Sequence, residues 1–158
     1  MVKSLYREFY KFSHRKLTWL APLIMLAFMF LMAGYPSARL LAMLTYDSSD
    51  AIMLVLVIVG STMFSMEFQN NAILTLLYKS AKKIDVYFAK LVTILIYDLM
   101  LHVLAILVTI LLTATIKPVS WMAVYQYGQP LLMNMVAATC IDIVSSMLII
   151  SLIFLETV

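Results

Sequence analysis

The sequence contains little of what soluble enzymes use for chemistry. Its three glycines, Gly34, Gly60 and Gly128, lie too far apart for a phosphate-binding loop, which requires two glycines five positions apart followed by Lys and Ser or Thr. A single cysteine, Cys140, cannot form an intrachain disulfide, and with two histidines it does not supply the usual ligands of a zinc site. No Gly-x-Ser-x-Gly motif occurs. We therefore expect neither an enzyme nor a cofactor in this chain.

Charged residues are scarce as well. They make up 12% of the 158 residues, against 65% hydrophobic residues, whereas about a quarter of a soluble domain is charged. Crossing a bilayer core of ~30 Å takes about 20 largely uncharged helical residues. Four stretches meet or nearly meet this requirement: residues 17–34, 51–66, 91–116 and 131–155. The sequence predicts an all-α membrane protein, with four transmembrane helices in one domain of residues 1–158 and the lipid bilayer around it.

The positions of the basic residues predict the orientation of the chain. Nine of the 11 Lys and Arg residues precede the first span or lie between the second and third spans, and only Arg39 and Lys117 lie in the other two loops. By the positive-inside rule, the N-terminus and the loop of residues 67–90 are expected in the cytoplasm. The basic residues on this side are expected to bind the anionic inner leaflet. The net charge of +3 therefore does not indicate a nucleic-acid partner, and we expect none.

Residues 1–16 predict an amphipathic helix that lies along the membrane surface. Apolar and aromatic residues share one helical face, and basic residues recur every four positions on another. The residues expected to anchor this helix are Lys3, Arg7, Lys11, Phe9 and Phe12. The alternative is a charged leader that does no more than anchor the first span.

Polar residues form one stripe in each of the last two predicted spans. In residues 91–116 the stripe consists of Asp98, His102, Ala105, Thr109 and Thr113, and in residues 131–155 of Asn134, Ala138, Asp142, Ser145 and Ser146. An ionisable residue costs at least ~2.5 kcal/mol at the centre of a span and suggests a function. We expect an intramembrane polar path of Asp98, His102, Asn134 and Asp142, with His102 close to Asp142 near the midplane. The alternative is that these groups only hydrogen-bond the helices together.

The loop of residues 67–90 carries a recognisable pattern. Glu67 follows the second span, Leu76 and Leu77 lie in an apolar stretch, and Lys83 and Lys90 lead into the third span. Together with the N-terminal amphipathic helix, this order resembles the permease subunits of bacterial ATP-binding-cassette exporters of the ABC-2 type. The resemblance covers residues 1–158, although Asn and Ala at positions 71 and 72 replace the Gly-Thr pair of that family.

The resemblance implies both a partner and a function. Glu67, Leu76, Leu77, Lys83 and Lys90 would couple the chain to a separate cytoplasmic ATP-binding subunit, and residues 1–16 would be the elbow helix. The permease would work as a homo- or heterodimer in the bacterial cell membrane and export an apolar or amphipathic substrate, such as an antimicrobial peptide or a drug. Members of the family usually have six spans, so a chain of four is expected to be a truncated form.

Two other functions are compatible with the sequence. The first is a self-contained proton-coupled carrier or channel that uses Asp98, His102 and Asp142 and needs no ATPase. The second is a membrane protein that does not transport, such as an immunity or assembly protein, in which the polar residues and the loop would both tolerate substitution. Copurification of an ATPase that depends on residues 67–90 would distinguish the exporter from both.

Overall fold

The computed structural model describes residues 2–34, 36–69, 83–116 and 118–156. Most of these residues are helical; residues 118–130 form turns before α7, and the described part contains no strand beyond an isolated bridge between Val124 and Pro130. The elements in chain order are α1 (Val2–Ser13), α2 (Lys16–Met32), α3 (Ala38–Met43), a 3₁₀ turn η1 (Thr45–Asp47), α4 (Ser48–Gln69), α6 (Lys83–Thr115) and α7 (Leu131–Glu156). The predicted all-α fold is confirmed for these residues.

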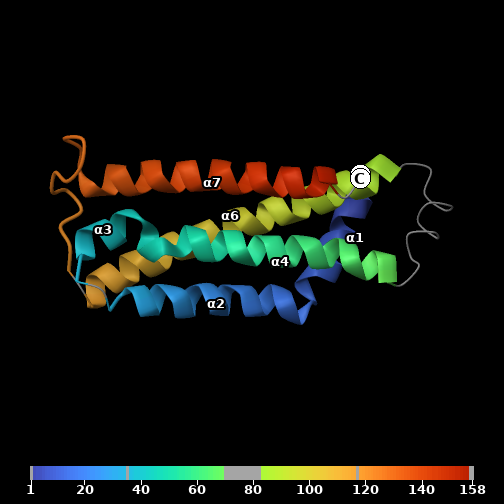
Figure 1. Ribbon diagram of the computed structural model, residues 1–158, viewed down its shortest axis with the longest axis horizontal. Helices are drawn as coiled ribbons and strands as arrows, with labels where there is room; N and C mark the ends of the chain where they lie inside the picture. The colour runs from blue at the N-terminus through green and yellow to red at the C-terminus, as the bar shows by residue number, and fades with distance from the viewer. Residues whose placement is uncertain (1, 35, 70–82, 117, 157–158) are drawn as a thin grey trace.

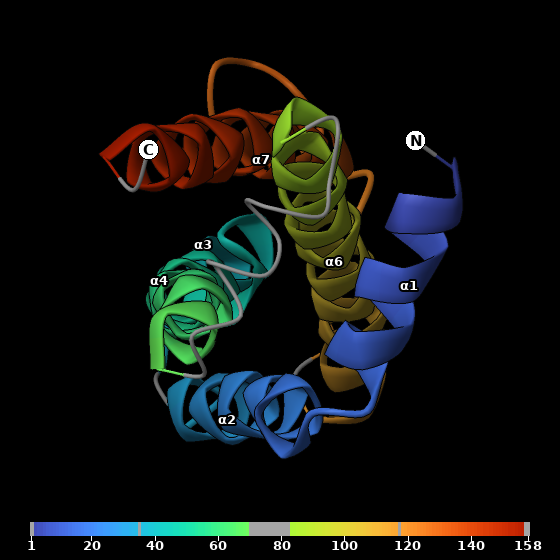
Figure 2. The same cartoon turned by 90° about the vertical axis from the view of Figure 1, so that its right-hand side faces the viewer.

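The long helices α2, α4, α6 and α7 lie side by side and alternate in direction (Figure 1). Seen from the end, they surround a common core in the order α2, α4, α7, α6, and α1 packs on the outer side of α6 (Figure 2). One end of the bundle holds α1, the end of α4 and the start of α6, and the other holds α3, η1 and the segment before α7.

Two of the described helices are long and apolar enough to cross a membrane. The candidate spans are Phe88–Thr115 in α6 and Leu131–Ile153 in α7. A third candidate is the pair Leu5–Ser13 and Lys16–Met32, in which α1 and α2 meet at a bend of 63°. The described residues thus contain two to three candidate spans. The predicted second span, residues 51–66, falls on α4, a helix of 22 residues, and its crossing and the orientation of the N-terminus stay predictions.

The helices differ in extent from the predicted spans. Whereas the third span was predicted for residues 91–116, α6 already begins at Lys83 and runs for 33 residues. The span was started after Lys90 because that is the last charge before the apolar run, but a helix continues through lysines, which are good helix formers. The predicted loop of residues 67–90 accordingly includes the end of α4 and the first turns of α6, and its residues 70–82 lie outside the described part.

The bundle core consists of apolar side chains that recur at helical spacing. It includes Met25 and Met29 of α2, Ile52, Val55, Leu56 and Val59 of α4, and Ile94, Leu101 and Leu112 of α6. The opposite faces carry large apolar residues in the open, as a lipid solvent allows, for example Leu23 at 61% and Leu152 at 63% exposure. Packing inside the bundle and contact with lipid therefore use different faces of the same helices.

A tight turn connects α3 to α4 where the sequence predicts an outer loop. Thr45, Tyr46 and Asp47 have positive φ angles of 48°, 53° and 53°. This left-handed region is costly for a β-branched or bulky residue. Tyr46 is fully buried, and Thr45 and Ser48 share a hydrogen bond of 2.7 Å between their hydroxyl groups. The turn therefore packs into the bundle instead of lying on its surface.

Candidate functional site

The ionisable residues of the two spans lie at the same depth. The midpoint of Phe88–Thr115 falls between Leu101 and His102, and the midpoint of Leu131–Ile153 is Asp142. Since α6 and α7 pack side by side, these positions bring His102 and Asp142 to the middle of the bundle. The polar cluster described next therefore lies where a bilayer would be driest.

Every residue of the polar stripe on α6 is buried. Asp98 is 0% and His102 3% exposed, and Ala105, Thr109 and Thr113 are equally covered. The threonine hydroxyls donate to carbonyls of their own helix, with Thr109 Oγ1 2.8 Å from Ala105 O and Thr113 Oγ1 2.9 Å from Thr109 O. Because these bonds satisfy them locally, the threonines offer no chemistry. The reactive part of the stripe is confined to Asp98 and His102.

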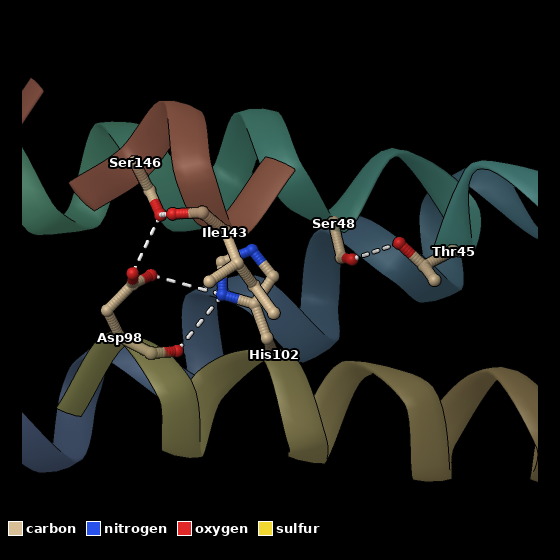
Figure 3. Close-up of polar contacts among 6 residues, drawn as sticks. All are labelled: Thr45, Ser48, Asp98, His102, Ile143 and Ser146. Atoms are coloured by element: carbon tan, nitrogen blue, oxygen red, sulfur yellow. Dashed lines mark hydrogen bonds and ion pairs between the residues drawn. The ribbon is translucent and has the colours of Figure 1, made fainter. Parts of the chain in front are cut away.

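Asp98, His102 and Ser146 form a connected polar cluster between α6 and α7 (Figure 3). His102 Nδ1 lies 3.0 Å from the backbone oxygen of Asp98 and 3.1 Å from its Oδ1. Ser146 Oγ lies 2.7 Å from Asp98 Oδ2 and 2.9 Å from the backbone oxygen of Ile143. His102 Nε2 is buried and finds no hydrogen-bond partner among the described residues. Asp98 Oδ1 likewise makes no hydrogen bond among the described residues beyond its charge contact with His102 Nδ1.

The hydrogen bonds of this cluster suit both protonation states of Asp98. A serine hydroxyl has one proton to donate and can also accept. When Asp98 is ionised, Ser146 donates to its Oδ2. When Asp98 carries a proton on Oδ2, it can donate to Ser146, which then donates to Ile143 O. No heavy atom has to move between these two hydrogen-bonding arrangements.

His102 has a fixed orientation, because its Nδ1 must carry a proton to bond the Asp98 backbone oxygen. Neutral His102 then presents Nε2 as a bare acceptor, and protonated His102 presents it as a donor. In either state the unpartnered nitrogen points away from Asp98, toward α4 and α7 (Figure 3).

Asp142 lies beside this cluster but makes a different contact. Its carboxylate lies beside the Ser49 side chain and within electrostatic range of His102 and Asp50. Ser49 belongs to the first turn of α4, so the carboxylate faces the start of a helix, where the helix dipole favours negative charge. His102 and Asp142 thus interact through their charges, whereas the hydrogen bond from α7 to α6 comes from Ser146.

Asn134, the fourth residue of the predicted polar path, lies elsewhere. Its Nδ2 donates to the backbone oxygens of Gln126 and Gln129, at 3.2 and 3.5 Å. These bonds fix the segment that precedes α7 to the first turn of that helix. Asn134 is two turns from Asp142, and the structure does not bring it to Asp98 or His102.

The junction of α1 and α2 is held by side chains that cap α1. Thr18 Oγ1 donates to the backbone oxygen of Phe12 at 2.8 Å, and Trp19 Nε1 donates to that of Ser13 at 2.9 Å. The hydroxyl of Tyr97 on α6 donates to the backbone oxygen of Thr18 at 2.7 Å. The first two bonds satisfy carbonyls at the end of α1, and the third satisfies a carbonyl of α2 that has no donor four residues on because that residue is Pro22. Together they fix the 63° bend to α6.

The residues predicted to anchor α1 to the membrane divide into two groups. Arg7 is exposed, Phe9 is 40% exposed, and Lys11 pairs with Glu8 at 3.3 Å while remaining half exposed. Phe12 differs from the prediction, because it is 2% exposed and packs edge-on against Tyr97 with ring centroids 4.9 Å apart. The face of α1 that carries Glu8 and Phe12 turns toward α6. The side chain of Lys3 lies outside the described part.

The residues predicted to couple to an ATPase are only partly described. Glu67 lies in the last turns of α4 and Lys83 is the first residue of α6, but their side chains, with Leu76 and Leu77, lie outside the described part. Lys90 is 3% exposed, so its side chain does not lie open on the surface of this chain. The role of these five residues in coupling stays a prediction.

Sequence reasoning missed three residues that shape these sites. The sequence pattern singles out none of Tyr97, Thr18 and Ser49. The spacing of four between Ser146 and Asp142 did place Ser146 on the polar stripe, but nothing in the sequence indicates that it reaches Asp98. Among the described residues no group of three His, Cys, Asp or Glu side chains could hold a metal ion.

Comparison with known proteins gives one match. No curated protein and no solved structure matches the chain. The sequence does match the family described as ABC-2 family transporter protein over residues 4–158, from the elbow to the end of α7. That family typically forms the non-catalytic membrane subunit of a transporter and associates with an ATP-binding subunit. Because the match covers nearly all of its residues, the chain belongs to the ABC-2 family of transporter proteins.

Proposed function

We propose that this chain is a permease subunit that exports an apolar or amphipathic substrate, such as an antimicrobial peptide or a drug, with energy from a separate ATP-binding subunit. The observation that carries the proposal is the family match over residues 4–158. The geometry agrees with it, since a bent elbow precedes a bundle of long apolar helices. The permease would act in the bacterial cell membrane as a homo- or heterodimer.

Four crossings with the N-terminus in the cytoplasm complete this proposal. The second crossing would be a broken one, formed by α3, η1 and the first half of α4. Support comes from Ser49, because a residue in the first turn of α4 meets Asp142 at the midpoint of α7. Irregular backbone at that depth is tolerated where protein covers it, as the burial of Thr45, Tyr46 and Ser48 shows.

The contact with the ATPase would involve the segment between α4 and α6. Glu67 and Lys83 lie where these helices end and begin, at the end of the bundle that also holds α1 (Figure 1). Closure of an ATPase on this segment would push on α4 and α6 together. Since α6 carries Asp98 and His102, such a push would reach the polar cluster.

The test is copurification of the tagged full chain from its own host, followed by an ATP-binding assay of the bound proteins. We expect an ATP-binding subunit to copurify and to be lost when Leu76 and Leu77 are both replaced by Asp. Arg39→Asp is the control, because Arg39 is exposed in α3 at the other end of the bundle. Failure to recover any ATP-binding protein, or recovery that ignores the Leu76 and Leu77 changes, would contradict the proposal.

A second candidate function, proton-coupled transport, is favoured by one observation. Asp98 Oδ2 is hydrogen-bonded to Ser146 between the two spans, and His102 Nε2 is buried without a hydrogen-bond partner among the described residues. The chain reconstituted alone in vesicles distinguishes the two functions. Substrate movement driven by a pH gradient without ATPase would support proton coupling, whereas movement only with the ATPase and ATP would support the exporter.

A further inference from the structure

An apolar groove of about 580 Å³ lies between the elbow and α6. Its walls come from three helices: Phe9 from α1, Trp19 and Pro22 from α2, and Met100 and Val103 from α6. Met100 and Val103 are 59% and 57% exposed and lie on the face of α6 opposite the buried Asp98. A molecule can therefore enter the groove from the bilayer without passing through the bundle.

A second hollow, of about 630 Å³, adjoins this groove and is polar on one side. It is lined by Ser13, His14, Lys16, Trp19, Leu20 and Leu23, and shares Ser13 and Trp19 with the groove. Although Trp19 is 70% exposed, its indole nitrogen donates to Ser13 O at 2.9 Å, which fixes the ring between the two hollows. The two hollows thus meet at one fixed side chain.

The charge around the junction is of one sign. Residues 11–16 read Lys-Phe-Ser-His-Arg-Lys, which contains no acidic residue, and Lys16 is exposed at the hollow. Arg15 Nη1 is buried and has no hydrogen-bond partner among the described residues. Cations beside a long apolar groove, with an indole between them, match an amphipathic ligand that has an anionic headgroup.

We propose that the elbow binds one anionic glycerophospholipid, with its phosphate at His14 and Lys16 and one acyl chain in the groove between α2 and α6. A soluble anion would leave the groove empty, and a neutral lipid would leave the exposed Lys16 at the hollow without an anionic partner. The bound lipid would tie the elbow to α6 directly beside Tyr97, whose hydroxyl already bonds the backbone of Thr18.

Trp19 itself can report on this site. The chain has two tryptophans, so Trp121→Phe leaves Trp19 as the only one. The full-length variant is placed in nanodiscs that contain increasing fractions of phosphatidylglycerol or phosphatidylcholine with brominated acyl chains, which quench indole fluorescence on contact. We expect half-quenching at a fraction of phosphatidylglycerol about fivefold lower than of phosphatidylcholine, the contribution of roughly one cation near an anionic lipid.

Two pairs of variants separate the headgroup from the acyl chain. Lys16→Gln should remove the preference for phosphatidylglycerol, Lys16→Arg should keep it, and Arg39→Gln, at the other end of the bundle, should leave it unchanged. Val103→Phe should reduce quenching by filling the groove. Val144→Phe should not, because Val144 is an equally exposed valine at 58% on α7 and does not line the groove.

Several results would overturn the proposal. Equal quenching by both lipids would mean that Trp19 meets ordinary boundary lipid. No quenching by either lipid would mean that a protein surface, such as a second copy of the chain, covers the groove. Equal effects of Val103→Phe and Val144→Phe would mean that the acyl chain does not lie in the groove. None of these measurements involves an ATPase or transport, so they do not depend on the proposed export function.

Discussion

The Ser146 hydroxyl of α7 donates a hydrogen bond of 2.7 Å to Oδ2 of Asp98 on α6, across 48 positions of sequence. Both residues are buried, at 2% and 0% exposure, near the middle of the candidate spans. At this depth no water competes for either group, so the bond links the two helices directly. The bond between Ser146 and Asp98 therefore helps to hold α6 and α7 together, whether or not the polar stripes also take part in transport.

Ser146→Ala should lower the stability of the helix bundle. Hydrogen bonds between membrane helices contribute about 0.6 kcal/mol on average and up to about 1.7 kcal/mol. We expect a loss in this range when unfolding by SDS is followed by circular dichroism. Ser151→Ala is the control, because Ser151 Oγ bonds Met147 O of its own helix at 2.7 Å and should cost less. Equal losses in both variants would show that the link to Asp98 contributes nothing.

Asp142→Asn should leave folding intact and reduce transport. Asparagine keeps the shape of the side chain and an oxygen that can accept from Ser49, but it removes the charge that acts on His102. We expect a stability change below about 1 kcal/mol, in the range of a single polar contact between membrane helices. Transport is measured in vesicles that contain the complete transporter. Unchanged transport with reduced stability would instead assign Asp142 a structural role.

Much of the architecture follows from local properties of the sequence. Long apolar runs predict the helices, and the charge pattern of residues 1–16 predicts the separate α1. The spacing of Asp98 and His102 by four residues predicts one shared face, which the structure buries. The spacing alone also predicts that Thr109 and Thr113 follow that face. Such inferences succeed because helical periodicity determines which side chains point the same way.

Contacts between distant segments could not be predicted in this way. Phe12 was expected at the membrane because its neighbours Phe9 and Tyr10 are apolar, but only the packing of α1 on α6 decides which of them is covered. The same holds for Ser49, which looks like a cap in a loop until the turn at Tyr46 places it beside Asp142. The left-handed turn at positions 45–47 has no clear signature in the sequence, because Thr and Tyr normally avoid that conformation.

Phe12→Ala and Phe9→Ala should differ strongly in their effect on stability. The side chains belong to the same helix, yet Phe12 is 2% exposed against Tyr97 and Phe9 is 40% exposed. Removing a buried Phe costs about 3 to 5 kcal/mol, so Phe12→Ala should release α1 from α6. Hydrogen exchange of α1 in detergent should report this release, while Phe9→Ala should leave exchange nearly unchanged. If α1 shows the same hydrogen exchange in both variants, the burial of Phe12 does not stabilise the packing of α1 on α6.

Tyr97→Phe should lower the stability of the fold, whereas Tyr46→Phe should not. The Tyr97 hydroxyl donates to Thr18 O at 2.7 Å, and losing such a bond costs about 0.5 to 1.5 kcal/mol. The Tyr46 hydroxyl is buried without a hydrogen-bond partner among the described residues. Burying an unpaired hydroxyl costs about 1 to 3 kcal/mol in proteins, so its removal should stabilise the fold or leave it unchanged. Phenylalanine keeps the ring and the left-handed backbone at position 46, so the comparison isolates the hydroxyl group.

Unfolding by SDS measures the stability of both variants. A clear loss of stability in Tyr46→Phe would mean that this hydroxyl has a partner in the membrane, such as a bound water.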